Sequence, residues 1–177
     1  MRKWLLLFAV MFLLPTALAA QEESPKAEVF AGYSYGRVHV SGAPAFNMNG
    51  ASASVSFNPT RSLGIVADFG GYHVGNIGGA SVDANVYTYL FGPKVAYRHG
   101  RFTPYAQALF GGAHASASAF GISGSDNSFA MALGGGVDVN ATEHIGIRLI
   151  QAEYLMTRFS SETQNNARIS AGIVFRF

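Results

Sequence analysis

The sequence predicts an all-β fold, an eight-stranded antiparallel transmembrane β-barrel of an outer membrane. Three observations lead to this prediction. The chain opens with the pattern of an export signal. The remainder has no second long apolar run that could form a membrane helix. Apolar residues instead alternate with a period of two in blocks of about 10 to 15 residues, which is typical of membrane barrels.

An export signal is predicted at the start of the chain. Arg2 and Lys3 precede an apolar run over residues 5–14, which is too short to span a bilayer as a helix. Ala17 and Ala19 then supply the small residues that a signal peptidase needs. We expect a signal peptide over residues 1–19 and an outer-membrane β-barrel domain over residues 20–177, with cleavage one residue later, or an anchor that is never removed, as alternatives.

Composition excludes several classes of function. Without the leader, the chain has ten basic and ten acidic residues. The basic stripe of a nucleic-acid-binding protein is therefore not expected. The chain has no cysteine. Disulfides, thiol catalysis, thiolate metal sites and a lipoprotein anchor are therefore excluded.

The last block shows the clearest alternation. One face carries Ala167, Ile169, Ala171, Ile173, Phe175 and Phe177, and the other carries Arg168, Ser170, Gly172, Val174 and Arg176. A register slip of one residue would exchange the two faces, so the pattern fixes the orientation. We expect the isoleucines and phenylalanines to face lipid and Arg176 to face the lumen or the periplasm.

Seven earlier blocks follow the same pattern, over residues 28–39, 49–58, 63–73, 83–98, 102–114, 128–139 and 144–158. In the seventh of these blocks the phase slips, because Gln151 and Glu153 fall on the apolar face. A β-bulge near Ile150 would restore the alternation.

The connections between blocks alternate in length. Short turns are expected at residues 58–61, 99–101 and 140–143, and longer loops at 41–48, 74–82, 115–127 and 159–166. Short periplasmic turns and longer outer loops are usual in such barrels. This arrangement places both termini on the periplasmic side.

A soluble β-sandwich or a lipocalin-like barrel is the main alternative fold. Against it, the non-apolar face is built of Gly, Ala and Ser with few charges, which is unlike a solvated exterior. Aromatic residues also gather near the ends of the blocks, where membrane interfaces lie: Tyr33, Tyr35, Phe57, Tyr87, Tyr89, Tyr97, Phe175 and Phe177.

Several short motifs resemble a known family. They are Phe91-Gly92-Pro93-Lys94, Gly134-Gly135-Gly136-Val137-Asp138-Val139, Ile147-Arg148-Leu149 with Glu153-Tyr154-Leu155, and the ending Gly172-Ile173-Val174-Phe175-Arg176-Phe177. Together they resemble the small outer-membrane β-barrel family related to the membrane domain of outer-membrane protein A. The resemblance covers essentially the whole chain after the leader.

The resemblance implies partners and a location. The C-terminal Phe177 resembles the signal read by the barrel-assembly machinery of the bacterial outer membrane. Outer-membrane lipid and lipopolysaccharide are the other expected partners. The chain stops at Phe177, so we expect no periplasmic peptidoglycan-binding domain and no role in anchoring the membrane to the cell wall.

One pair of residues suggests catalysis. His114 and Ser116 lie two apart on one strand face and resemble the pair in barrel enzymes that deacylate lipid A. Such enzymes also need an acidic partner for the histidine. Asp126 is the nearby candidate, but it departs from the family's Glu and lies in a Gly/Ser segment. We expect no intrinsic catalysis and no catalytic residue, with a lipid A-modifying enzyme kept as an alternative.

No metal or cofactor is expected. The histidines fall at outer strand ends or in short turns without an acidic cluster: His39, His73, His114, His99 and His144. Residues 134–136 are three consecutive glycines, but no Lys-Ser/Thr pair follows them, so they are not a phosphate-binding loop. We expect them to make room for a large lumen side chain or to permit strand curvature.

The charges predicted to face inward are the most informative group: Asp68, Lys94, Asp138, Arg148 and Glu153. An eight-stranded barrel is just wide enough for side chains to fill it, and charges there must be paired or hydrated. We expect Lys94 and Arg148 to pair with these carboxylates, and Gly136 to lie close to the position opposite Arg148. A closed lumen implies a structural or surface-contact role, and a hydrated one implies a narrow, porin-like ion channel.

Overall fold

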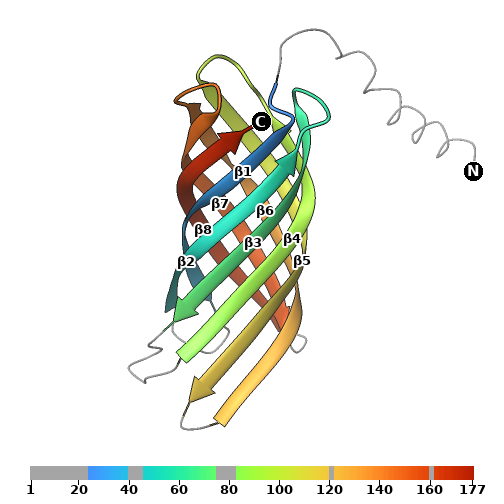
Figure 1. Cartoon of the computed structure of the whole chain (residues 1–177). Helices are drawn as coiled ribbons and strands as arrows, with labels where there is room; N and C mark the ends of the chain where they lie inside the picture. The colour runs from blue at the N-terminus through green and yellow to red at the C-terminus, as the bar shows by residue number, and fades with distance from the viewer. Residues whose placement is uncertain (1–23, 40–45, 75–82, 120–121, 160–161) are drawn as a thin grey trace, which may run out of the picture.

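The computed structural model describes residues 24–39, 46–74, 83–119, 122–159 and 162–177. Eight antiparallel strands form a closed barrel in which each strand pairs with its neighbours in the sequence and β1 pairs with β8 (Figure 1). The strands are β1 (Ala27–His39), β2 (Phe46–Phe57), β3 (Leu63–Val74), β4 (Asp83–Ala96), β5 (Phe102–Ala119), β6 (Ile122–Asn140), β7 (Ile145–Phe159) and β8 (Glu162–Arg176). The predicted fold class is confirmed.

The alternation of the sequence becomes an alternation of burial. In β3 every second residue is buried, and the residues between them are exposed or half-buried. Ile169, Ile173, Phe175 and Phe177 are exposed, at 42 to 70% of their surface. Arg168 is buried on the opposite face. The predicted orientation of the last block is therefore confirmed.

The two ends of the barrel differ. We call one end of the barrel the proximal end (Figure 1). It carries the C-terminus, the start of β1 and the turns at residues 58–62, 97–101 and 141–144. In two of these turns a threonine hydroxyl accepts a hydrogen bond from the amide three residues later, at Thr60–Leu63 and Thr142–Ile145, both at 3.0 Å. The opposite end is called the distal end.

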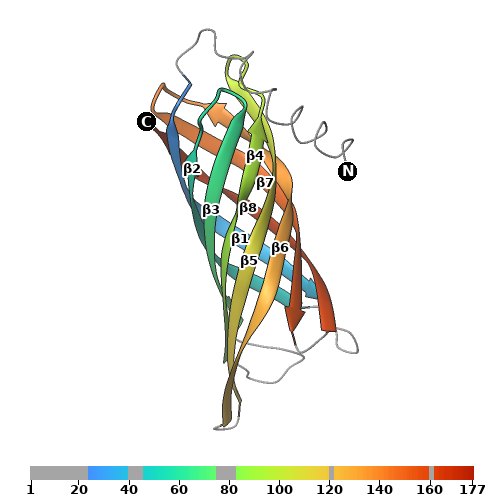
Figure 2. The same cartoon turned by 90° about the vertical axis from the view of Figure 1, so that its right-hand side faces the viewer.

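Three of the four long loops predicted at the distal end have the wrong bounds, since β2 already begins at Phe46, within the loop predicted at residues 41–48. Residues 115–119 and 122–127 extend β5 and β6, in a register that runs to Ala119 opposite Ile122. β8 likewise begins at Glu162. These segments are rich in Ser, Ala and Gly, which is a composition typical of loops. Their backbones nevertheless form the same hydrogen-bonded pairs as other strands. The β5–β6 hairpin consequently reaches furthest from the barrel at the distal end (Figures 1 and 2).

The predicted β-bulge is confirmed. Val137 of β6 lies opposite Ile150 of β7, but the next residue of β6, Asp138, lies opposite Arg148. The register between the two strands therefore shifts at this point, and Leu149 is left without a residue opposite it. Leu149 and Ile150 are both exposed, at 55 and 46%. Two consecutive outward residues correct the phase, so that Gln151 and Glu153 point inward.

The N-terminal prediction lies outside the described residues, which begin at residue 24. The signal peptide over residues 1–19 therefore stays a prediction. Among the described residues, none forms a helix long and apolar enough to cross a membrane.

The bulge can be tested with single spin labels, since the chain has no cysteine to remove. Labels at residues 147 to 151 should report lipid, lumen, lipid, lipid and lumen to a lipid-soluble relaxation agent, because the bulge turns two adjacent residues outward. Labels at residues 169 to 173 in β8 are the control and should alternate strictly. Strict alternation at 147 to 151 as well would contradict the bulge.

Candidate functional site

Among the described residues, nine charged side chains gather inside the barrel, and we call them the charged lumen. They are Glu28, Asp68, Lys94, Arg98, Asp138, Arg148, Glu153, Arg168 and Arg176. Their side chains are at most 10% exposed. Five are basic and four acidic, so the group is close to neutral.

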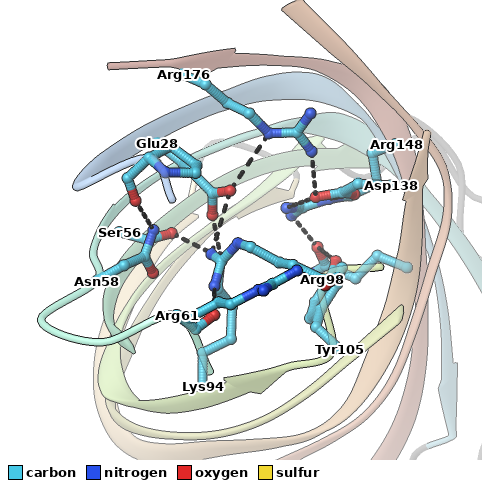
Figure 3. Close-up of polar contacts among 12 residues, drawn as sticks. Glu28, Ser56, Asn58, Arg61, Lys94, Arg98, Tyr105, Asp138, Arg148 and Arg176 are labelled. Atoms are coloured by element: carbon cyan, nitrogen blue, oxygen red, sulfur yellow. Dashed lines mark hydrogen bonds and ion pairs between the residues drawn. The ribbon is translucent and has the colours of Figure 1, made fainter. Parts of the chain in front are cut away.

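Glu28 is the centre of the cluster at the proximal end (Figure 3). Its carboxylate lies 2.6 Å from the Nζ of Lys94, 3.3 Å from the Nη2 of Arg98 and 3.4 Å from the Nε of Arg176. Lys94 also donates a hydrogen bond to Ser56 at 3.1 Å. One carboxylate of β1 therefore connects two residues in and just after β4 with the end of β8.

Asp138 and Arg148 form an ion pair beside the Glu28 cluster at the proximal end. The Nε and Nη2 of Arg148 donate to the two carboxylate oxygens of Asp138 at 2.8 and 3.1 Å, which is the bidentate geometry that Arg favours. The guanidinium lies over the rings of Phe30 and Tyr105, 4.2 and 4.6 Å from their centroids. Arg176 reaches within 4.0 Å of Asp138 and so connects this pair with Glu28.

Arg168 is the centre of a second cluster, deeper in the barrel. Its guanidinium lies 2.8 Å from Asp68 and 2.6 Å from Glu153, with all three side chains at most 1% exposed. It also donates to the hydroxyl of Tyr72 at 3.2 Å. Arg168 of β8 therefore pairs with its neighbour β7 and, across the lumen, with β3.

Gln151 connects the two clusters. Its carbonyl oxygen accepts hydrogen bonds from Arg148 at 2.5 Å and from Tyr105 at 2.8 Å. Its amide donates to Glu153 at 2.7 Å, and Gln107 donates to the other oxygen of Glu153 at 2.8 Å. Polar contacts thus run without interruption from Glu28 at the proximal end to Asp68.

The glycines of β6 make room for this network, as predicted. A Cβ at Gly134 would lie 2.8 Å from the side chain of Glu153, and one at Gly136 would lie 2.8 Å from the hydroxyl of Tyr105. The expected position of Gly136 is wrong, however. It lies opposite Gln151, because the bulge places Asp138 opposite Arg148.

All five predicted inward charges are buried in the lumen, and Arg148 pairs with Asp138 as one of its expected partners. The expected partners of Lys94 are wrong, since it pairs with Glu28. Sequence reasoning left Glu28 and Arg98 out of the network. It placed Arg168 on the inner face but did not recognise it as a centre. Glu28 directly precedes Val29, which faces outward. The alternation of faces along the strand therefore already indicated that Glu28 points inward.

Of the residues considered for the enzyme alternative, His114 and Ser116 share the outward face of β5, but Asp126 does not lie with them. His114 lies on the outward face, and its ring nitrogen is 2.9 Å from the side-chain oxygen of Asn127. Asp126 lies across from Ala115, on the other face of the sheet. His73 is bonded in the same way to Asn85, at 3.0 Å. In the part of the chain that the structure describes, no three His, Asp or Glu side chains gather as a metal site.

The sequence matches a known protein family. The family described as outer membrane protein beta-barrel domain matches residues 6–177. No protein with a curated description matches the sequence.

Solved structures show the same fold. The attachment invasion locus protein Ail of Yersinia pestis is 20% identical with a TM-score of 0.62, covering 86% of this chain and all of its own. Neisserial surface protein A is 17% identical with a TM-score of 0.69, covering 88% of this chain and all of its own. The N-terminal β-barrel domain of OprF from Pseudomonas aeruginosa is 15% identical with a TM-score of 0.54, covering 86% and 100%.

The cluster of Arg168, Asp68 and Glu153 gives a prediction of stability. Arg168→Met should lower the free energy of unfolding by on the order of 3 kcal/mol, because it leaves Asp68 and Glu153 buried without their cation. The measurement is urea unfolding in lipid vesicles. Adding Asp68→Asn and Glu153→Gln to the variant should restore part of the loss.

Arg158→Met is the matched control for this prediction. Arg158 belongs to β7 but is exposed, so its loss should change the unfolding midpoint little. Equal effects of the two substitutions would contradict the assigned role of Arg168.

Proposed function

Because the chain belongs to the outer membrane protein β-barrel domain family, we propose that it is a closed barrel of the bacterial outer membrane with a structural or surface-contact role and no intrinsic catalysis. The observation that carries the proposal is the uninterrupted polar network from Glu28 to Asp68. An ion path would need a continuous hydrated channel past these side chains. Buried, mutually paired charges instead favour a lumen filled by protein.

The distal end supplies the contact surface. The β5–β6 hairpin extends beyond its neighbours there (Figure 2). Elsewhere on the outward face, in β1 and β7, the hydroxyl of Tyr33 donates to Asn49, and that of Tyr154 donates to Asn165. Tyrosine suits a membrane interface, since its ring is apolar and its hydroxyl polar. Outer-leaflet lipid and lipopolysaccharide are the proposed partners of this surface.

Export and assembly involve the two termini in this proposal. The leader over residues 1–19 would be removed after export, and the strand ending at Phe177 would be read by the barrel-assembly machinery. In support, Phe177 exchanges two backbone hydrogen bonds with Ala27, at 2.9 and 3.1 Å. The end of the chain thus pairs directly with the first strand and closes the barrel.

Two measurements on one refolded sample test the proposal. Conductance tests whether the lumen is closed, and lipid A chemistry tests whether the protein lacks catalysis. Wild type should show no steady conductance in planar bilayers, because the network fills the lumen. The mass of lipid A should also stay unchanged, with His114→Ala as the comparison. A steady open channel would favour the ion-channel alternative, and a mass change that His114→Ala abolishes would favour the enzyme.

The contact surface can be tested by shortening the β5–β6 hairpin. Ala113 lies opposite Ser128, so an Asn-Gly turn joining these two residues preserves the register below them. The variant should still fold. Lipopolysaccharide in the vesicles should raise the unfolding midpoint of wild type more than that of the variant, and phospholipid vesicles are the control. Equal stabilisation of both proteins would contradict a role of the hairpin in this contact.

A further inference from the structure

The two ends of the barrel differ in charge. Inside the lumen at the proximal end, four basic side chains share two carboxylates. Just outside the lumen, the described chain adds three basic residues, Lys26, Arg61 and Arg101, and one acidic residue, Glu143. The proximal end therefore carries seven Lys and Arg residues against three Asp and Glu residues. The rest of the described chain carries three against five.

Three neighbouring segments form the basic side of this end, which we call the basic rim: residues 24–26, 58–62 and 97–101. The backbone amide of Asn58 donates to the carbonyl oxygen of Lys26 at 2.8 Å, which joins the first two segments. The side chain of Arg61 donates to the carbonyl oxygen of Arg98 at 2.8 Å, and that of Arg98 donates to the carbonyl oxygen of Arg61 (Figure 3). The three basic segments are thus adjacent rather than scattered around the barrel.

Two cations of the basic rim are available to an outside partner. Lys26 and Arg101 are exposed, and neither forms an ion pair with another described residue. The carboxylates of the lumen are already engaged, because Glu28 is shared by three cations and Asp138 by two. Glu143 belongs to the next turn, outside the rim. The rim therefore presents a positive surface that suits an anion from outside the barrel.

The basic rim lies where the lipid-facing surface ends. Phe57, Tyr97 and Phe102 point outward beside it and are 58 to 67% exposed. Such aromatic residues mark the membrane interface in barrels. Arg101 directly precedes Phe102, and Lys26 lies one residue beyond the register partner of Phe57. Both cations therefore lie at the depth of the lipid headgroups.

We propose that the basic rim binds the phosphate groups of anionic phospholipids in the leaflet around the proximal end, in preference to zwitterionic phospholipids. Charge supplies the selectivity, because a zwitterionic headgroup carries its own cation next to its phosphate. Depth favours lipid as the source of the phosphate, because Lys26 and Arg101 lie beside the lipid-facing surface. The inference concerns the end opposite to the proposed contact surface and depends neither on that contact nor on a closed lumen.

The preference can be measured by fluorescence quenching in phosphatidylcholine vesicles. Phe57→Cys carries a fluorophore on the lipid-facing side beneath the rim, and Tyr87→Cys carries one near the distal end. The quencher is a small fraction of phosphatidylglycerol or phosphatidylcholine with the same nitroxide on the same acyl carbon. At residue 57 phosphatidylglycerol should show a local enrichment of about threefold, and at residue 87 the two lipids should quench equally. Equal quenching at residue 57 would overturn the proposal.

Paired variants assign the preference to the basic rim. In Phe57→Cys protein, Lys26→Gln together with Arg101→Gln should bring the ratio of the two quenching constants close to one. Arg37→Gln together with Arg158→Gln removes the same charge near the distal end and should leave the ratio unchanged. All four side chains are exposed, so each variant should still fold. An equal fall of the ratio in both double variants would reduce the effect to net charge and overturn the proposal.

Free phosphate is the other source of the same chemistry. Glycerol phosphate, compared with sodium chloride of equal ionic strength, should leave the preference at residue 57 unchanged. Salt at about 1 M should abolish the preference, because the Debye length falls to about 3 Å. A preference that glycerol phosphate alone removes would assign the rim to soluble phosphate and overturn the proposal. A preference that persists at high salt would overturn its electrostatic basis.

Discussion

The structure depends on the rule that a charge inside a narrow barrel must find its partner there. Eight strands leave an interior that side chains can fill, so little water is available to solvate an ion. Arg168 meets this requirement with Asp68 and Glu153, and Glu28 meets it with two arginines and Lys94. The glycines of β6 follow from the same rule, because larger residues there would occupy the space of Tyr105 and Glu153.

The face to which each strand residue points could be predicted from the sequence. Lipid on one side of the sheet and packed protein on the other impose an alternation with a period of two. Even the break in parity near Ile150 was predictable, since only a bulge returns Gln151 to the interior. The partners of Lys94 were not. Glu28 reaches Lys94 across strands that are not neighbours, and such contacts depend on the barrel's stagger. The length of the β5–β6 hairpin was also missed, since its Ser and Ala residues have the composition of a loop.

The lumen is divided along its length. Ion pairs fill the proximal and central parts, and apolar side chains surround a cavity in the distal part. Tyr72 joins the two with its ring on one side and its hydroxyl on the other. Backbone pairing of β1 with β8 closes the barrel, and the ionic part fills its lumen with paired charges. The distal part is lined without a charged side chain, so it has no charge that needs a partner.

The ion pairs also constrain the barrel in a way that backbone pairing cannot. Backbone hydrogen bonds connect only adjacent strands, and a shift of register can preserve many of them. Arg168 of β8 contacts Asp68 of β3, on the far side of the lumen. A one-residue slip of β8 would turn Arg168 toward lipid and leave two carboxylates buried without their cation. The charged lumen therefore penalises the wrong register even where its net contribution to stability is small, and in this barrel the specificity of closure is its main physical effect.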